Sequence, residues 1–171
     1  KTRMVLLFLS FVVCVFGTVS VWPLPQTMQL SDDSVALCSN FSFVQRSSQP
    51  VITAAVRRYA QWIGKSVSSS SGCVDTLTID ATTVVSLGPD VDESYTLTSS
   101  PVWKIFAPTF VGVLRAIETF SNLISCSRNG TLCAVPSSVF IKDFPRFLHR
   151  GLMLDTSRHY LRVSTILRVI E

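Results

Sequence analysis

The sequence has 171 residues, of which 47% are hydrophobic and 15% charged, and its net charge is +4. This length suits one domain, or one domain and part of another, and the apolar content excludes a wholly disordered chain. The basic residues of the tail are spread among apolar ones. Nucleic-acid binding needs a basic cluster interleaved with aromatic residues, so we expect no nucleic-acid partner.

Residues 1–20 have the pattern of a secretory signal peptide. Basic residues precede an apolar run from Met4 to Phe16, and small residues follow it. A run of roughly 7–15 apolar residues in this setting is typical of a signal peptide, whereas a membrane span needs about 20. Cleavage after Gly17 or after Ser20 fits the pattern, and an uncleaved anchor is the alternative. We therefore expect export to a lysosomal, vacuolar or extracellular destination, with no membrane attachment after cleavage.

The next residues predict an extended segment, a strand and a helix. Residues 21–30 contain two prolines and read as extended chain, and apolar residues alternate with polar ones over Asn40–Val44. Pro50 can open a helix, because its missing N–H needs no partner in the first turn. Gly64 is a plausible end for that helix. The residues expected on its apolar face are Ile52, Ala55, Val56, Tyr59 and Ile63.

A serine-rich stretch, residues 66–72, predicts a solvated loop, and short strands follow it. The strands are expected over Thr76–Asp80 and Val84–Val85. After the turn signal Gly88-Pro89-Asp90, the segments Tyr95–Thr98 and Val102–Phe106 predict a hairpin.

The clearest helix is expected over Thr109–Ile124, with Thr109 as its N-cap. The residues expected on its apolar face are Phe110, Val113, Leu114, Ile117, Phe120 and Ile124. A further short strand is expected over Val139–Ile141. Strands, a hairpin and helices with one wide apolar face predict an α+β fold, a sheet with helices on one face, spanning residues 21–142.

Four cysteines lie beyond the signal segment, at Cys38, Cys73, Cys126 and Cys133. An even number behind a signal peptide indicates two disulfides, and four cysteines allow three pairings. The tight-turn dipeptide Asn129-Gly130 favours facing strands and a Cys126–Cys133 bond, which leaves Cys38 with Cys73. No Cys-x-x-Cys motif or histidine-rich cluster occurs, so we expect neither a metal site nor a cofactor.

Two Asn-x-Ser/Thr triplets agree with export. They begin at Asn40 and at Asn129. Each triplet is weak alone, but together with a signal peptide they predict glycosylated surface loops.

The tail, residues 143–171, differs from the rest of the chain. The apolar run Gly151–Leu154 predicts a strand buried on both faces, and Asp155, Arg158 and His159 gather at its C-terminal end. A helix is expected from Ser164. A strand, a polar cluster at its carboxyl end and a helix are how a (β/α)₈ barrel begins, and barrel enzymes place their sites at that end.

The stretch Arg150–Tyr160 (RGLMLDTSRHY) resembles the first barrel strand of β-N-acetylhexosaminidases, the family 20 glycoside hydrolases. Its lead-in Asp143–Phe147 resembles theirs, as do Leu114–Leu123, Glu93–Leu97 and Val21–Gln26 farther upstream. The resemblance therefore covers residues 21–171. It implies a non-catalytic N-terminal domain at residues 21–142 and the start of the catalytic barrel at residues 143–171.

The resemblance implies roles for individual residues. Arg158 corresponds to the arginine that binds hydroxyls of the terminal N-acetylhexosamine, and Asp155 to the acidic residue that orients it. A surface ion pair between the two is the structural alternative. For His159, packing or support of the site competes with direct sugar contact. Arg162 departs from the family, where proline is usual.

The family hydrolyses terminal N-acetylglucosamine or N-acetylgalactosamine from glycans, and the acetamido oxygen of the substrate acts as nucleophile. An Asp–Glu pair on later barrel strands assists, and this sequence contains no match to it, so we expect no catalytic residue within the chain. We expect this chain to be the N-terminal part of such an enzyme. A homodimer and a heterodimer are both possible for the enzyme. A non-catalytic decoy subunit or weak glycan-binding module is the alternative.

Overall fold

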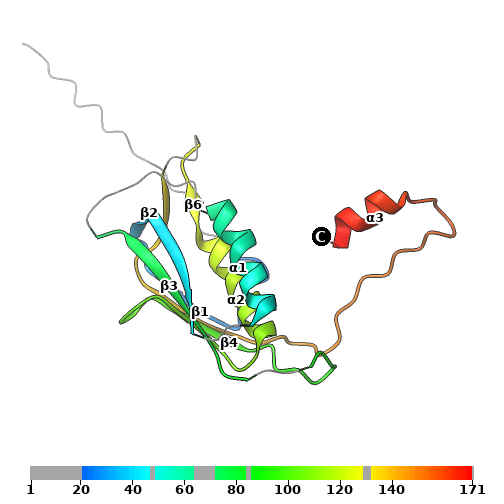
Figure 1. Ribbon diagram of the computed structural model, residues 1–171, viewed down its shortest axis with the longest axis horizontal. Coiled ribbons are helices and arrows are strands. Elements are labelled where there is room, and N and C mark those ends of the chain that lie inside the picture. The colour runs from blue at the N-terminus through cyan, green and yellow to red at the C-terminus, as the bar shows by residue number, and fades with distance from the viewer. Residues whose placement is uncertain (1–20, 47–48, 64–71, 84–85, 129–131, 171) are drawn as a thin grey trace, which may run out of the picture.

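The computed structural model describes residues 21–46, 49–63, 72–83, 86–128 and 132–170, which form a sheet, two helices on one of its faces and an extended tail with a third helix (Figure 1). The strands are β1 (Thr27–Leu30), β2 (Ser34–Gln45), β3 (Val74–Ala81), β4 (Tyr95–Thr98), β5 (Lys104–Ala107), β6 (Ser125–Cys126), β7 (Cys133–Pro136) and β8 (Val139–Asp143). The helices are α1 (Pro50–Ile63), α2 (Phe110–Leu123) and α3 (Val163–Ile170).

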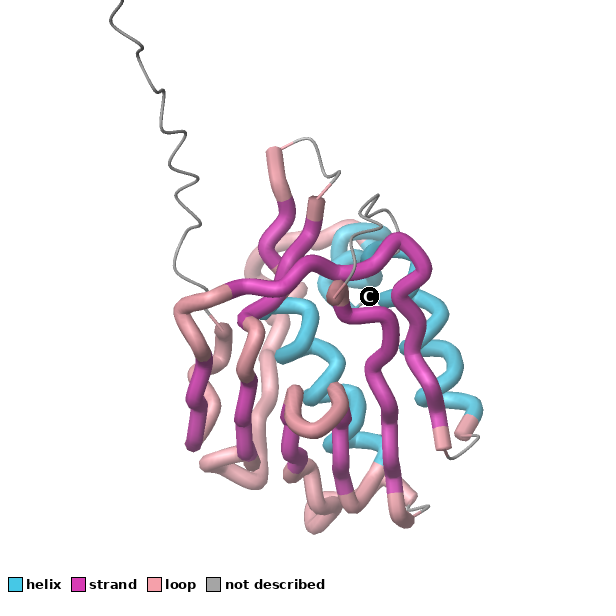
Figure 2. Tube along the Cα trace, turned by 90° about the vertical axis from the view of Figure 1, so that its left-hand side faces the viewer, coloured by secondary structure: helices cyan, strands magenta, loops and turns pink. Residues whose placement is uncertain are grey.

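The sheet has eight strands in the order β1-β8-β4-β5-β3-β2-β7-β6. Figure 2 shows strands side by side, with the helices on one face. The neighbours β2, β3 and β5 run parallel, because α1 carries the chain back from the end of β2 to the start of β3. The remaining pairs are antiparallel. The expected hairpin is confirmed, since β4 pairs with β5 and Leu97 lies opposite Ile105.

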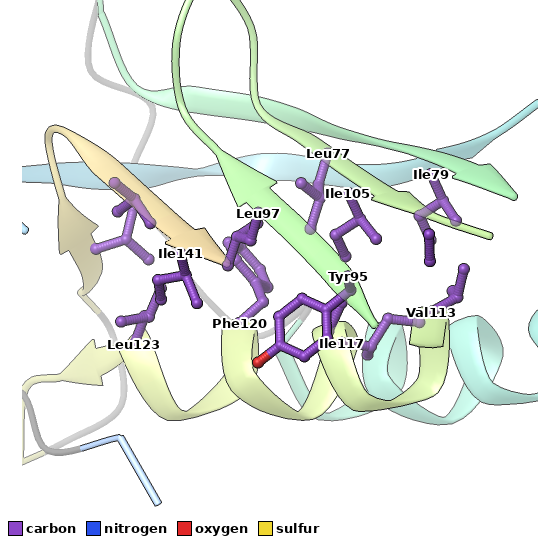
Figure 3. Packing of buried hydrophobic residues seen from close by; sticks show 14 of the residues in the cluster. Leu77, Ile79, Tyr95, Leu97, Ile105, Val113, Ile117, Phe120, Leu123 and Ile141 are labelled. Atoms are coloured by element: carbon purple, nitrogen blue, oxygen red, sulfur yellow. The ribbon is translucent and has the colours of Figure 1, made fainter. Parts of the chain in front are cut away.

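The core lies between the sheet and α2 (Figure 3). Alternate residues of β3, β4, β5 and β8 point to this side and are fully buried, as the period of a strand requires. They are Leu77, Ile79, Leu97, Ile105 and Ile141. From α2 they meet Val113, Ile117, Phe120 and Leu123, which are also fully buried. Helical spacing had placed the first three of these four on the apolar face of this helix, so the predicted packing is confirmed.

Phe120 is the largest of the fully buried side chains. Its ring centroid lies 5.8 Å from those of Phe41 and Trp103 and 6.3 Å from that of Phe43. Phe41 and Phe43 come from the alternating stretch of β2, so that pattern placed two rings against the helix. Aromatic rings of this size contribute much of the apolar surface that drives folding.

The predicted first residue and the predicted apolar face of α1 are also confirmed. The helix begins at Pro50, and Ile52, Ala55 and Ile63 are buried. Predictions on Gly64, residues 66–71, Val84–Val85, Asn129-Gly130 and the signal segment lie outside the described residues. β8 ends at Asp143, one position beyond the expected limit of the sheet.

The expected strand over Gly151–Leu154 is not formed. Leu152 and Met153 are 75% and 88% exposed. A strand buried on both faces needs a hydrogen-bonded neighbour and packing above and below, and no described strand of this chain pairs with this segment. The expected helix is present as α3, which begins at Val163 and buries none of its residues. Of the predicted start of a barrel, the structure therefore contains the helix, but an extended segment takes the place of the strand.

Candidate functional site

Asp155 and Arg158 lie together at the end of the segment where they were expected. Asp155 Oδ1 accepts hydrogen bonds from the backbone N–H of Ser157, at 2.9 Å, and of Arg158, at 3.4 Å. Its other oxygen, Oδ2, lies 3.1 Å from Arg158 Nε. The bond from Asp155 to the backbone N–H two residues on is the usual way in which an aspartate stabilises a tight turn. The same carboxylate also binds the guanidinium of Arg158.

The Arg158 side chain is 86% exposed, and among the described residues only Asp155 contacts its guanidinium. A guanidinium has five N–H donors in a fixed plane. Because Nε is bound to Asp155, the four N–H donors on the two terminal nitrogens face solvent. The side chain is thus oriented at its inner end and open at its outer end, as a residue that binds a planar or paired acceptor requires.

His159 and Tyr160 follow directly and are exposed. Within the described residues neither has a hydrogen bond to protein. The structure therefore brings Asp155 and Arg158 together and leaves His159 outside their contact.

The segment that precedes this site is attached to the rest of the fold at Asp143. Its carboxylate accepts the backbone N–H of Gln26 at 3.0 Å and the hydroxyl of Tyr95 at 3.3 Å. The Tyr95 hydroxyl also lies 2.6 Å from the hydroxyl of Thr119 in α2. Burial, more than the nearby Asp143 carboxylate, raises the pKa of Tyr95 well above its ordinary value, so this hydroxyl stays protonated and can donate.

A second fixed point is Arg150, for which the sequence predicts a structural role but no partner. Its Nη1 donates to the carbonyl oxygen of Phe147, and its Nη2 reaches both carboxylate oxygens of Glu93. Glu93 also accepts from Arg115 Nε at 3.0 Å. Arg150 and Glu93 are 57 positions apart, so no local spacing could show the pair. The nearest signal was the resemblance of both segments to one family.

Both expected disulfides are present. Cys38 bonds to Cys73 and Cys126 to Cys133. Cys126 and Cys133 lie opposite each other in β6 and β7, which confirms the facing strands. Asn40 is exposed on β2, as a glycosylation acceptor must be, and Asn129 lies outside the described residues.

No three or more described histidine, cysteine, aspartate or glutamate residues are grouped so that they could hold a metal ion. Among the described helices, none combines the length and apolar character needed to cross a membrane.

Residues 21–123, more than half of the chain, match the family described as beta-acetyl hexosaminidase like. The chain belongs to this family. The match runs from ahead of β1 through α2 and does not include the tail segment Arg150–Tyr160.

Named relatives of this hexosaminidase-family chain cover most of its length. It is 36% identical over 172 residues to beta-hexosaminidase subunit alpha of Mus musculus, covering 89% of this chain and 32% of the relative. It is 33% identical over 162 residues to beta-hexosaminidase subunit B1 of Dictyostelium discoideum, covering 88% and 29%. The chain thus spans about a third of the length of the curated relatives that it matches.

The fold is shared with a solved member of the family. The structure of the chitobiase of Flavobacterium johnsoniae superposes with a TM-score of 0.69 and 28% identity, over 85% of this chain and 24% of the chitobiase chain. The α+β arrangement of sheet and helices is therefore a family feature.

Proposed function

We propose that this chain is the N-terminal part of a β-N-acetylhexosaminidase, and that Arg158 binds hydroxyl groups of the terminal, non-reducing N-acetylhexosamine. The observation that carries the proposal is the state of Arg158, which is bound to Asp155 through Nε and open to solvent at its other nitrogens. Family membership and the names of the relatives, beta-hexosaminidase subunits and a chitobiase, supply the substrate class.

The geometry suits neighbouring sugar hydroxyls. Two terminal guanidinium nitrogens in one plane can each donate to one hydroxyl oxygen of a vicinal pair, which a lysine ammonium cannot match. Asp155 fixes the plane, because its bond to Nε restricts rotation of the guanidinium. Hydrogen bonds that involve a charged donor contribute about 1.5–3 kcal/mol each, so two of them supply substantial binding energy.

The catalytic mechanism in this proposal is the one that the family resemblance implies. The substrate's acetamido oxygen attacks the anomeric carbon, an aspartate orients the acetamido group, and a glutamate protonates the leaving oxygen. Most glycosidases use two protein carboxylates instead. Residues 1–171 contain no match to the Asp–Glu pair, so residues 21–142 act as a non-catalytic domain and residues 143–171 supply the beginning of the catalytic barrel. The segment Gly151–Leu154 becomes a strand when other barrel strands pair with it.

The cellular setting is part of the proposal. The two disulfides fit an oxidising compartment, which agrees with export by the expected signal peptide. The relatives are named as subunits, so we infer that the complete enzyme contains more than one chain, as a homodimer or a heterodimer would. Glycans that end in N-acetylglucosamine or N-acetylgalactosamine are the substrates.

The proposal is tested by following the anomer that is released first. A hexosaminidase that carries this sequence should hydrolyse an aryl N-acetyl-β-glucosaminide with retention, so that the β-anomer of the sugar is seen first by proton NMR. The chain of 171 residues alone should release no aryl alcohol above the blank. Release of the α-anomer first would contradict the assisted mechanism, and turnover by the chain alone would contradict the assignment of the catalytic pair elsewhere.

A further inference from the structure

Glu93 occupies an unusual position between two arginines from different parts of the chain. It lies just ahead of β4, and its side chain is only 16% exposed. Arg115 reaches it from α2, and Arg150 reaches it from the tail. The three side chains thus join the helix layer, the approach to the sheet and the start of the candidate sugar-binding segment.

The electrostatics of this ion triad (Glu93, Arg115 and Arg150) favour a fixed carboxylate. Burial by itself would raise the pKa of Glu93, but the hydrogen bonds from Arg150 and Arg115 outweigh it, and the pKa lies below its ordinary value. A partly buried carboxylate held by two guanidinium groups has few alternative geometries. The Arg158–Asp155 pair differs, because the Arg158 side chain is almost fully exposed.

Arg150 also restrains the segment of the chain that precedes it. While Nη2 binds Glu93, Nη1 donates to the carbonyl oxygen of Phe147 and so holds the chain that precedes it. At the other end of this stretch, Asp143 is bound by Gln26 and Tyr95. Residues 143–150 are therefore attached to the N-terminal domain at both ends, and the short stretch to Asp155 and Arg158 begins from the second attachment.

We propose that Glu93 and Arg150 are positioning residues that act on the sugar through Arg158. The N-terminal domain presents Glu93, braced by Arg115, and Glu93 sets where the segment bearing Arg158 begins. This inference rests on the proposed function, since it takes Arg158 to be the sugar-binding residue. It gives a domain without catalytic residues an indirect part in substrate recognition, through the position of Arg158.

The decisive test is a double-mutant cycle in an active hexosaminidase that carries this sequence. Glu93→Gln removes the charge that binds Arg150 and keeps the size of the side chain. If Glu93 acts through Arg158, Glu93→Gln lowers kcat/KM about tenfold in the wild-type background and less than about twofold in the Arg158→Lys background. Arg150→Lys, which keeps the charge without the forked geometry, should show the same non-additivity.

Asp80→Asn is the matched control. Asp80 forms a comparable, partly exposed ion pair with Lys104 on the sheet, at 2.9 Å, and contacts no part of the tail. This variant should leave kcat/KM within about twofold of wild type in both backgrounds. Equal losses from Glu93→Gln in both backgrounds, in variants whose circular dichroism is unchanged, would show a merely structural role and overturn the inference. If Arg158→Lys itself had no effect, the proposed function would fail instead.

A second measurement needs no activity. In this chain, trypsin should cut poorly after Arg150, because its guanidinium is engaged, and readily after the exposed Arg158. Glu93→Gln should raise the rate of cleavage after Arg150, relative to cleavage after Arg158, by about fivefold or more, and Asp80→Asn should leave the ratio unchanged. An unchanged ratio in Glu93→Gln would show that Glu93 does not hold the segment.

Discussion

Two carboxylates of this chain bind arginine side chains, and they differ in exposure. The Glu93 side chain is 16% exposed and is bound by two guanidinium groups, whereas that of Asp155 is 38% exposed and is bound by one. The first pairing leaves little freedom, and the second leaves the outer nitrogens of Arg158 open. Under the proposed function, Glu93 anchors Arg150, whereas Arg158 keeps free donors for the sugar.

The lowered pKa of Glu93 predicts how stability depends on pH. A carboxyl whose pKa is lower in the folded than in the unfolded state stabilises the fold above its unfolded pKa, and this contribution is lost as the pH falls through the folded pKa. The groups that face Glu93 are Arg115 and Arg150, which stay charged throughout. Glu93→Gln should therefore lower the free energy of unfolding by about 1 kcal/mol near neutral pH.

Below about pH 4.5, the ordinary pKa of a glutamate, the difference between Glu93→Gln and wild type should shrink progressively. Urea unfolding of both proteins over a series of pH values measures it. A difference that stayed constant or grew on acidification would contradict the ion triad.

At the scale of elements, α2 packs closely against the segment that precedes β4, because Gly112 has no side chain. A Cβ built there would overlap the backbone carbonyl oxygen of Ser94 and lie 3.0 Å from Cβ of Ala107. Thr109 caps the same helix, because its hydroxyl oxygen accepts from the N–H of Gly112 at 3.4 Å. This close approach also brings Arg115 to Glu93.

Gly112→Ala should destabilise the fold by about 2 kcal/mol. Alanine favours a helix over glycine by about 1 kcal/mol, but forcing the helix away from a backbone carbonyl costs more than this gain. Gly88→Ala is the control, because a Cβ there meets nothing within 4 Å. Urea unfolding that showed Gly112→Ala as stable as Gly88→Ala would contradict the packing described.

The two disulfides join elements at different separations in the chain. Cys38 and Cys73 are separated by 35 positions and join β2 to the start of β3, whereas Cys126 and Cys133 are separated by 7 and join β6 to β7. By loop-closure entropy, the larger loop should contribute about 4 kcal/mol and the smaller about 2 kcal/mol.

Replacing both cysteines of the pair Cys38–Cys73 by serine should therefore lower the free energy of unfolding more than replacing those of Cys126–Cys133. Both pairs include a buried cysteine, so the new serines meet similar surroundings. Equal losses in urea unfolding would show that loop size does not govern their effect.

At the scale of the whole molecule, the sequence predicted what depends on local pattern. Spacing alone gave α2 with its Thr109 cap, the β4–β5 hairpin and the packing of one helix face on a sheet. It did not give the strand order, because β2 lies between β3 and β7 through contacts between distant segments. The pair Asp155 and Arg158 is close in sequence and was foreseen, whereas the partner of Arg150 was not.

The failure over Gly151–Leu154 has the same cause. An apolar run predicts a buried strand only when other strands cover it, and the described part of this chain provides none. Under the proposed function, further barrel strands would cover Gly151–Leu154 and surround Arg158, which is 86% exposed in the described chain.

The central claim is that Arg158 binds the terminal sugar, and the most direct measurement is kcat/KM of Arg158→Lys in a hexosaminidase that carries this sequence. Lysine keeps the charge and loses the fork, so the loss of two charged hydrogen bonds should lower kcat/KM at least about 10²-fold. Arg168→Lys, at an exposed position on α3, should have no such effect. If Arg158 only pairs with Asp155 at the surface, the loss stays under about 1 kcal/mol. A folded Arg158→Lys enzyme within about fivefold of wild type would contradict the claim.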